Sequence, residues 1–189
     1  MLQLQDVTAS ILDYADLALP HLQDLAEALG EATGMAVLDG LEVRHAIRVS
    51  SKRLVAANIP PGALFPAHAT AMGKVLLAEL DTGLVRDLAV RYPLVRFTPT
   101  TVTSMEELLG QLREVARQGY AVSDAEWDPG LRSVAAPVRK QDGRVVAAVC
   151  ALSVQSSMTV RDMQRQFLPA VIDTAAAISW ELGYRISGE

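Results

Sequence analysis

The sequence predicts an α+β fold built on a mainly antiparallel β-sheet. Two hairpin patterns, residues 35–49 and 131–153, each place an Asp-Gly turn between strand-like runs rich in Val and Ala. Helical patterns precede, separate and follow these hairpins, and the longest of them lie at the two ends of the chain. Hairpins interrupted by helices favour this class over a doubly wound parallel sheet, in which single strands and helices alternate.

The N-terminal segment, residues 5–29, has apolar residues at helical spacing. Pro20 interrupts the pattern, which restarts at Leu22, so this proline fits the first turn of a second helix or a kink. Gly30 or Gly34 is expected to end the helix.

The first hairpin comprises residues 35–38, the turn Asp39-Gly40 and the arm 41–49. A third strand is expected over residues 54–59, where the following Pro60-Pro61-Gly62 ends it. Three helices then follow, over residues 71–80, 83–91 and from Ser104 to Gly119. Their N-caps are Asp81-Thr82 for the second helix and the capping-box pattern Ser104-Met-Glu-Glu107 for the third.

The C-terminal half begins with a strand over residues 120–123 and a polar, turn-forming loop over 124–130. The second hairpin follows, and its arms, 131–139 and 144–153, are apolar enough for central strands. Alternation along the first arm places Leu131, Ser133 and Ala135 on one face and Arg132, Val134 and Ala136 on the other. A single long helix is expected from Thr159 to Gly183.

Composition indicates one compact domain. The chain has 189 residues, of which 50% are hydrophobic, and this is apolar enough that a second copy is expected to cover some of the surface. No apolar run approaches the ~18 residues of a membrane span, and the N-terminus lacks a basic signal-peptide start, so we expect a cytoplasmic protein with no membrane partner. The single cysteine, Cys150, excludes an intrachain disulfide.

Charge is distributed unevenly along the chain. Residues 1–43 hold eight acidic and no basic residues, whereas the remainder holds seventeen basic and fourteen acidic residues, which together give the net charge of −5. Because DNA binding depends on clustered Lys and Arg, this chain alone is expected to bind nucleic acid poorly.

Enzyme motifs are missing. The sequence contains neither a G-x-S-x-G elbow nor an H-E-x-x-H pair. Gly73-Lys74 is not a phosphate-binding loop, because His68 replaces its first glycine and Val75 its magnesium-binding Ser or Thr. The scattered histidines predict no metal site, and we expect no cofactor. Cys150, within a run of Val and Ala, is interpreted as packing or pocket lining rather than as a nucleophile.

Two segments are candidates for ligand binding. In residues 66–75 a loop enters a helix through small residues, and the free N–H groups at the start of the helix favour binding of a carboxylate. The alternative is that the helix packs tightly on the sheet and needs Gly73 at the close crossing. In residues 124–133, Ser133 faces inward and either binds a ligand or bonds locally to backbone. The acidic residues of this second segment are interpreted as a solvated turn rather than a catalytic cluster; they are Asp124, Glu126 and Asp128.

These segments belong to a set that resembles the effector-binding domain of IclR-type bacterial transcriptional regulators. The matching stretches run in order along nearly the whole chain: residues 20–26, 36–40, 66–78, 96–103, 119–122, 130–138 and 143–148. The resemblance implies a GAF-like sensor fold that binds a small organic acid and forms dimers or tetramers. It implies a linker helix over residues 1–30 and an effector domain over 31–189, with operator DNA bound only through a winged helix-turn-helix domain absent from this chain.

The resemblance also implies the pocket residues. They are His68, Ala71, Met72, Gly73, Ser123, Leu131, Ser133, Cys150 and Leu152. Family members that bind very small polar acids carry an acid where Ser123 stands and hydroxyls where Cys150 and Leu152 stand. This less polar pocket favours an aromatic hydroxy acid as the ligand. The same ligand class is favoured by a likeness to the subgroup that senses protocatechuate or 4-hydroxybenzoate, which is found in residues 97–103, 131–138 and 165–169.

In the expected binding mode, the carboxylate lies on the backbone N–H groups of residues 71–73 with help from His68. The ring contacts Met72, Leu131 and Leu152, and Ser123 or Ser133 bonds its hydroxyls. Ligand binding shifts the population between two arrangements of the helices around the pocket, and the N-terminal helix transmits the difference to the DNA-binding domain. The chain is expected not to be an enzyme. Two alternatives stay open: an enzyme using Cys150 or the Asp124/Glu126 loop, and an oligomerisation module without a ligand.

Overall fold

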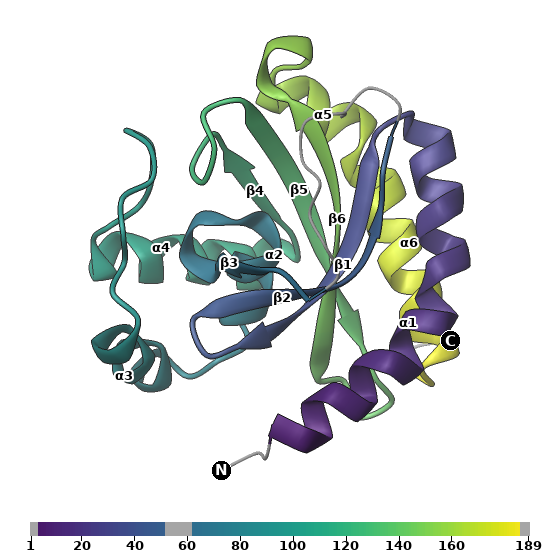
Figure 1. The fold of residues 1–189 in the computed structure, drawn as a ribbon, viewed down its shortest axis with the longest axis horizontal. Helices are drawn as coiled ribbons and strands as arrows, with labels where there is room; N and C mark the ends of the chain where they lie inside the picture. Colours follow the sequence, from purple (N-terminus) through teal and green to yellow (C-terminus); the bar gives the residue numbers. More distant parts are fainter. Residues whose placement is uncertain (1–3, 52–61, 186–189) are drawn as a thin grey trace.

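A six-stranded, curled sheet forms the centre of the computed structural model, which describes residues 4–51 and 62–185 (Figure 1). The strands lie in the order β3-β2-β1-β6-β5-β4, and every neighbouring pair is antiparallel. Their bounds are β1 Ala32–Asp39, β2 Glu42–Val49, β3 Leu64–Pro66, β4 Ala121–Asp124, β5 Leu131–Arg139 and β6 Val145–Val154. The predicted α+β class with an antiparallel sheet is confirmed.

Helices cover both faces of this sheet (Figure 1). On one face lie α1 (Leu4–Leu29), α5 (Val160–Gln166) and α6 (Leu168–Glu181). On the other face lies α2 (Ala71–Leu77), and α3 (Thr82–Arg91) and α4 (Met105–Gln118) extend the same core away from the sheet. The helices at the two ends of the described chain therefore share one face, and the helices from its middle lie on the other side.

Alternation along the strands separates two apolar cores. In β5, Ala135 packs with α2, whereas Val134 and Ala136 pack with α1 and α6, as predicted from the sequence. Leu22 of α1 and Ile178 of α6 are fully buried in the second core. The sheet thus leaves one face free to form a cavity beneath α2 while the opposite face holds the long helices.

The predicted helix caps are present. Ser104 Oγ accepts a hydrogen bond from the Glu107 N–H, and Gly119 ends α4 with a φ of 80°. Asp81 caps α3 and Thr159 caps α5 in the same way. These local signals fix where the helices begin.

Three boundaries differ from the prediction. α1 is one helix that contains Pro20, so of the two alternatives for this proline the start of a second helix is not realised. The predicted single C-terminal helix is wrong: it divides at Phe167, and Pro169 lies in the first turn of α6, where its missing N–H costs no helical hydrogen bond. α2 ends at Leu77 instead of residue 80.

The sequence did not predict β3. Leu64–Pro66 forms β3 and pairs with β2, a strand too short to show an alternation in the sequence. The predicted strand at residues 54–59 lies outside the described residues.

Candidate functional site

A cavity of about 50 Å³ lies between α2 and the sheet. Seven of the residues that the sequence pointed to line it: Ala71, Met72, Ser123, Leu131, Ser133, Cys150 and Leu152. The lining also includes residues that the sequence did not single out for this role: His45, Phe65, Ala69, Thr70, Trp127 and Asp128. The space between Met72 and Leu152 is therefore not filled by the protein's own side chains, although it is smaller than the ~150 Å³ of an engineered cavity that binds benzene.

His68 is outside this cavity. It lies in a separate depression beside Tyr92 and Phe97, and its Nε2 donates a hydrogen bond to the Val95 carbonyl at 3.0 Å. Burial lowers the pKa of His68, so the ring is neutral near pH 7. This placement does not support the expected contact between His68 and a ligand carboxylate.

Gly73 is also outside the cavity, because it faces the preceding turn. A Cβ atom added at this position would lie 2.1 Å from the Ala67 carbonyl oxygen. The glycine therefore permits α2 to approach the backbone of the preceding turn, whereas the alternative considered from the sequence placed the close crossing at the sheet. Its N–H donates to Thr70 Oγ1 at 3.2 Å, so the N-cap already uses one of the donors expected for a ligand.

The two serines of the site lie opposite each other on β4 and β5. Ser123 Oγ donates to the Ala69 carbonyl at 3.0 Å, which fixes the entry to α2 against the sheet. Ser133 also lines the cavity and pairs in register with Leu152 of β6. The hydroxyl nearer α2 is thus engaged by the protein, and Ser133 presents the other one to the cavity.

The loop between β4 and β5 is not the solvated turn expected from its sequence. Glu126 is buried, and both of its carboxylate oxygens accept from Nζ of Lys74, at 2.5 and 2.6 Å. Asp124 pairs with Arg132, and Asp128 accepts from the Gly130 N–H while it lines the cavity. The interpretation is therefore wrong for Glu126, because the tertiary fold supplies a buried cation that spacing along the chain could not reveal.

Threonines from residues 98–101 hold this loop in place. Thr98 Oγ1 donates to the Ala125 carbonyl at 2.7 Å, and Thr101 Oγ1 donates to the Glu126 carbonyl at 2.5 Å. Ala125 has a φ of 55°, a left-handed conformation that is rare for a residue with a side chain. The bonds fix a strained loop at the edge of the cavity.

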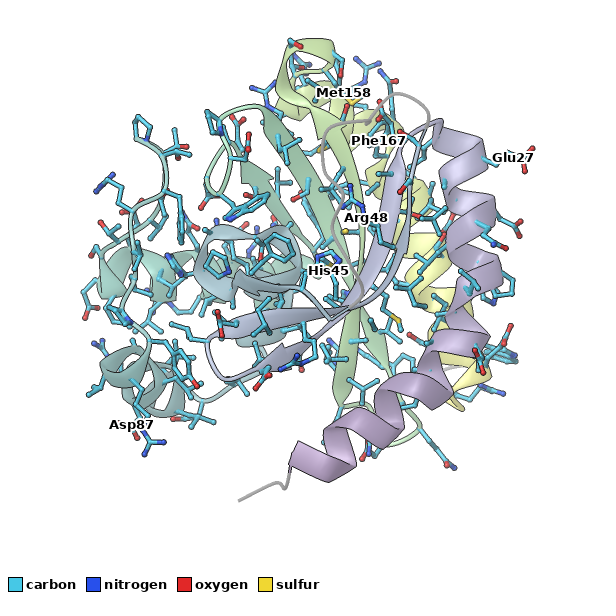
Figure 2. All side chains as sticks on the ribbon, viewed as in Figure 1. Glu27, His45, Arg48, Asp87, Met158 and Phe167 are labelled. Atoms are coloured by element: carbon cyan, nitrogen blue, oxygen red, sulfur yellow. The ribbon has the colours of Figure 1, made fainter. Side chains whose placement is uncertain are left out.

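Aromatic and basic residues from β2 and β3 form the other end of the site. His45 packs edge to face on Phe65, which in turn packs edge to face on Trp127. Burial, with a smaller effect from Arg48, lowers the pKa of His45 to about 4, and its Nδ1 has no partner among the described residues. Figure 2 shows His45 and Arg48 as neighbours near the middle of the sheet. Strand alternation from Val43 would have placed His45 inward, but no motif marked it.

Cys150 lines the floor of the cavity and is fully buried. Burial raises the pKa of its thiol to about 12. A neutral thiol is a poor nucleophile, so this arrangement supports the interpretation of Cys150 as pocket lining.

Within the described ranges the protein has neither a cluster of metal-binding side chains nor a helix that could span a membrane. Between residues 4 and 185, apart from the segment 52–61, His, Cys, Asp and Glu side chains form no group of three that could hold a metal ion. No helix within the same residues combines the length and the apolar character needed to cross a membrane.

Comparison with known proteins identifies relatives along nearly the whole chain. The family model "Bacterial transcriptional regulator IclR C-terminal" matches residues 7–180. The Pca regulon regulatory protein of Pseudomonas putida is 31% identical over 166 residues, which cover 87% of this chain and 57% of that protein. The chain therefore spans little more than half the length of this relative.

Two solved structures resemble the fold closely. The inducer binding domain of PobR from Acinetobacter, a double mutant in complex with 3-hydroxybenzoic acid, has a TM-score of 0.78 and 30% identity, covering 85% of this chain and 94% of that chain. An IclR homolog from Microbacterium hydrocarbonoxydans, in complex with 4-hydroxybenzoate, has a TM-score of 0.81 and 27% identity, covering 91% and 69% of the two chains.

Proposed function

The chain belongs to the IclR family of bacterial transcriptional regulators, with the GAF-like fold of its effector-binding domain, and we propose that its cavity binds an aromatic hydroxy acid as the effector. Binding of this acid changes the affinity for operator DNA of a separate winged helix-turn-helix domain that precedes α1. The regulator acts in the cytoplasm as a dimer or tetramer.

The observation that carries this proposal is the cavity itself. A largely apolar space with a few polar groups is typical of a small-molecule site. The apolar part comes from side chains that suit a flat ring, such as Met72, Leu131 and Trp127. Ser133 and Asp128 lie at one end and can bond ring hydroxyls. The hydroxybenzoates bound by two structural neighbours support the same ligand class.

The small volume indicates how a ring would enter. The side chains that restrict the cavity are flexible or come from loops: Met72 has three rotatable side-chain bonds, and Trp127 belongs to the β4–β5 loop. A ligand that moves them also changes the loop that Lys74 holds through Glu126. The ligand thus stabilises one of two arrangements around α2.

The change in the arrangement around α2 that the ligand stabilises reaches α1 through the sheet. β5 and β6 carry cavity residues on one face and, on the other, residues that pack in the same core as α1 and α6. A coupling of ~1–3 kcal/mol through this layer changes operator affinity roughly 5- to 150-fold. The effector is released unchanged, because no bond in it is made or broken.

A thermal-shift screen of small carboxylic acids tests the proposal. At 100 times its dissociation constant a ligand adds ~2.7 kcal/mol, and each kcal/mol moves the midpoint of a domain of this size by roughly 2–4 °C. 4-Hydroxybenzoate or protocatechuate should therefore raise the midpoint by roughly 5–10 °C and be recovered unchanged. If only glyoxylate-like acids act, the aromatic preference is wrong.

Variants locate the binding site. Leu131→Asp and Met72→Asp place a charge in the cavity and should abolish the ligand-induced shift. Leu84→Asp, on an exposed position of α3, is the matched control and should retain it. A shift that persists in both cavity variants would exclude this cavity as the site.

A further inference from the structure

Arg48 is a cation near the cavity, although it is not among the lining residues, and it has no anionic partner within the described residues. All three of its guanidinium nitrogens are buried, and none has a hydrogen-bond partner within the described residues. Burying a charge without a partner is costly, so folded proteins normally satisfy such a group. An unsatisfied guanidinium therefore indicates that a binding partner completes the site.

The sheet register places Arg48 on the cavity face. Gly34 of β1 pairs with Arg48 on one side and with Cys150 on the other, so the three residues share one face of the sheet. The charge of Arg48 also influences the pKa values of His45 and Cys150, both of which line the cavity. Its guanidinium thus lies within electrostatic reach of the cavity floor (Figure 2).

Gly34 keeps this part of the floor open. A Cβ atom at Gly34 would lie 2.9 Å from the Ile47 carbonyl oxygen and 3.7 Å from Nδ1 of His45. Without that side chain, nothing from β1 stands between Arg48 on β2 and the thiol of Cys150 on β6.

Several other groups that could hold an anion are already engaged. Lys74 binds Glu126, and His68 donates to a backbone carbonyl outside the cavity. At the start of α2, which has seven residues, the N–H groups of Gly73 and Lys74 bond to Thr70. Of the N–H groups of residues 71–73, on which the sequence placed the carboxylate, that of Gly73 is therefore already occupied.

We infer that Arg48 binds the carboxylate of the effector, an inference that rests on the proposed function of the cavity. A guanidinium forms two parallel hydrogen bonds with a carboxylate, a geometry that an apolar surrounding strengthens. Asp128 lies at the β4–β5 end of the cavity and repels a carboxylate there. The acid group therefore points to β2, and the ring hydroxyl points to Ser133.

Calorimetric titration with 4-hydroxybenzoate and its uncharged analogue 4-hydroxybenzamide tests the assignment. Arg48→Gln should weaken binding of the acid roughly 10- to 100-fold, the range expected for a charged hydrogen bond, and leave binding of the amide unchanged. Arg48→Lys should restore part of the affinity. Arg44→Gln is the matched control, because Arg44 lies on the same strand but pairs with Asp39, and it should change neither affinity.

A measurement without ligand separates binding from a structural role. Because its charge lacks a partner among the residues that the structure describes, Arg48→Met should not lower the thermal midpoint and should raise it if the residue is retained for binding. If Arg48→Met lowers the thermal midpoint and Arg48→Gln binds the acid as tightly as the wild type, the role of Arg48 is structural. This result would overturn the assignment and leave the proposed function intact. If the wild-type protein binds no acid of the screen, the proposed function fails and the assignment fails with it.

Discussion

Lys74 and Glu126, 52 residues apart in the sequence, form a buried ion pair that joins α2 to the β4–β5 loop. Burial lowers the pKa of the Lys74 ammonium and raises the pKa of the Glu126 carboxyl, and the attraction within the pair opposes both shifts. Since α2 and this loop both contribute cavity residues, the pair links the geometry of the ligand site to the stability of the fold.

Glu126→Gln should destabilise the protein strongly. Removing one partner leaves the Lys74 charge buried and uncompensated, which costs about 3–5 kcal/mol, or roughly 6–20 °C in the thermal midpoint. The double variant Lys74→Met/Glu126→Leu should recover much of this loss, because two apolar groups of similar size carry no desolvation cost. Differential scanning calorimetry measures both effects.

An exposed pair provides the control for this comparison. Glu114→Gln removes the partner of Arg117 on the surface of α4 and should have little effect on the midpoint. A cost for Glu126→Gln no larger than for Glu114→Gln would show that the buried pair is not a structural link.

Acidification should weaken the fold through His45. Its folded pKa is about 4, against about 6.5 in an unfolded chain, so the unfolded state binds a proton more readily between these values. This contribution to the free energy of unfolding is fully present above pH 6.5 and is lost as the pH falls toward 4, by up to about 3 kcal/mol. Urea denaturation at a series of pH values should show that the free energy of unfolding depends less steeply on pH in His45→Gln than in the wild type. Equal slopes would contradict the assignment to His45.

Cys150 should be chemically silent in the native state. Because burial raises its thiol pKa to about 12, Ellman's reagent at pH 8 should label almost none of the native protein and one thiol per chain after unfolding in guanidinium. Cys150→Ala should still bind 4-hydroxybenzoate. Rapid stoichiometric labelling of the native protein would instead favour the alternative of an enzyme with a cysteine nucleophile.

Gly73→Ala should destabilise the entry to α2. The added Cβ would meet the Ala67 backbone at 2.1 Å from its carbonyl oxygen, so the turn has to move. Gly110→Ala in α4 is the matched control, since its Cβ would meet only the end of Arg113 at 3.8 Å, and it should stabilise the helix by about 0.5–1 kcal/mol. Chemical denaturation of both variants distinguishes a steric requirement for glycine from an effect of helix propensity. An equal change in the free energy of unfolding for Gly73→Ala and Gly110→Ala would exclude the steric requirement.

Local patterns in the sequence predicted most of the fold because they act over a few residues. The Asp39-Gly40 turn and the Ser104 capping box set a hairpin and a helix start through backbone groups next to them. The division at Phe167 was missed because the apolar spacing continues through it, and Pro169 fits a first turn as well as a kink. β3 was missed because three residues are too few to show a period.

The sequence by itself determined the antiparallel α+β fold and the inward face of β5, since alternation and capping depend on neighbours along the chain. Its resemblance to a known family, rather than any local pattern, indicated seven of the residues that line the cavity. Tertiary structure alone decided that Glu126 meets Lys74, that Gly73 lies against the Ala67 backbone and that Arg48 faces Cys150 across Gly34 with no partner among the described residues. The physical reason is that pairing and desolvation of charges depend on which distant segments meet, and no local period in the sequence encodes that meeting.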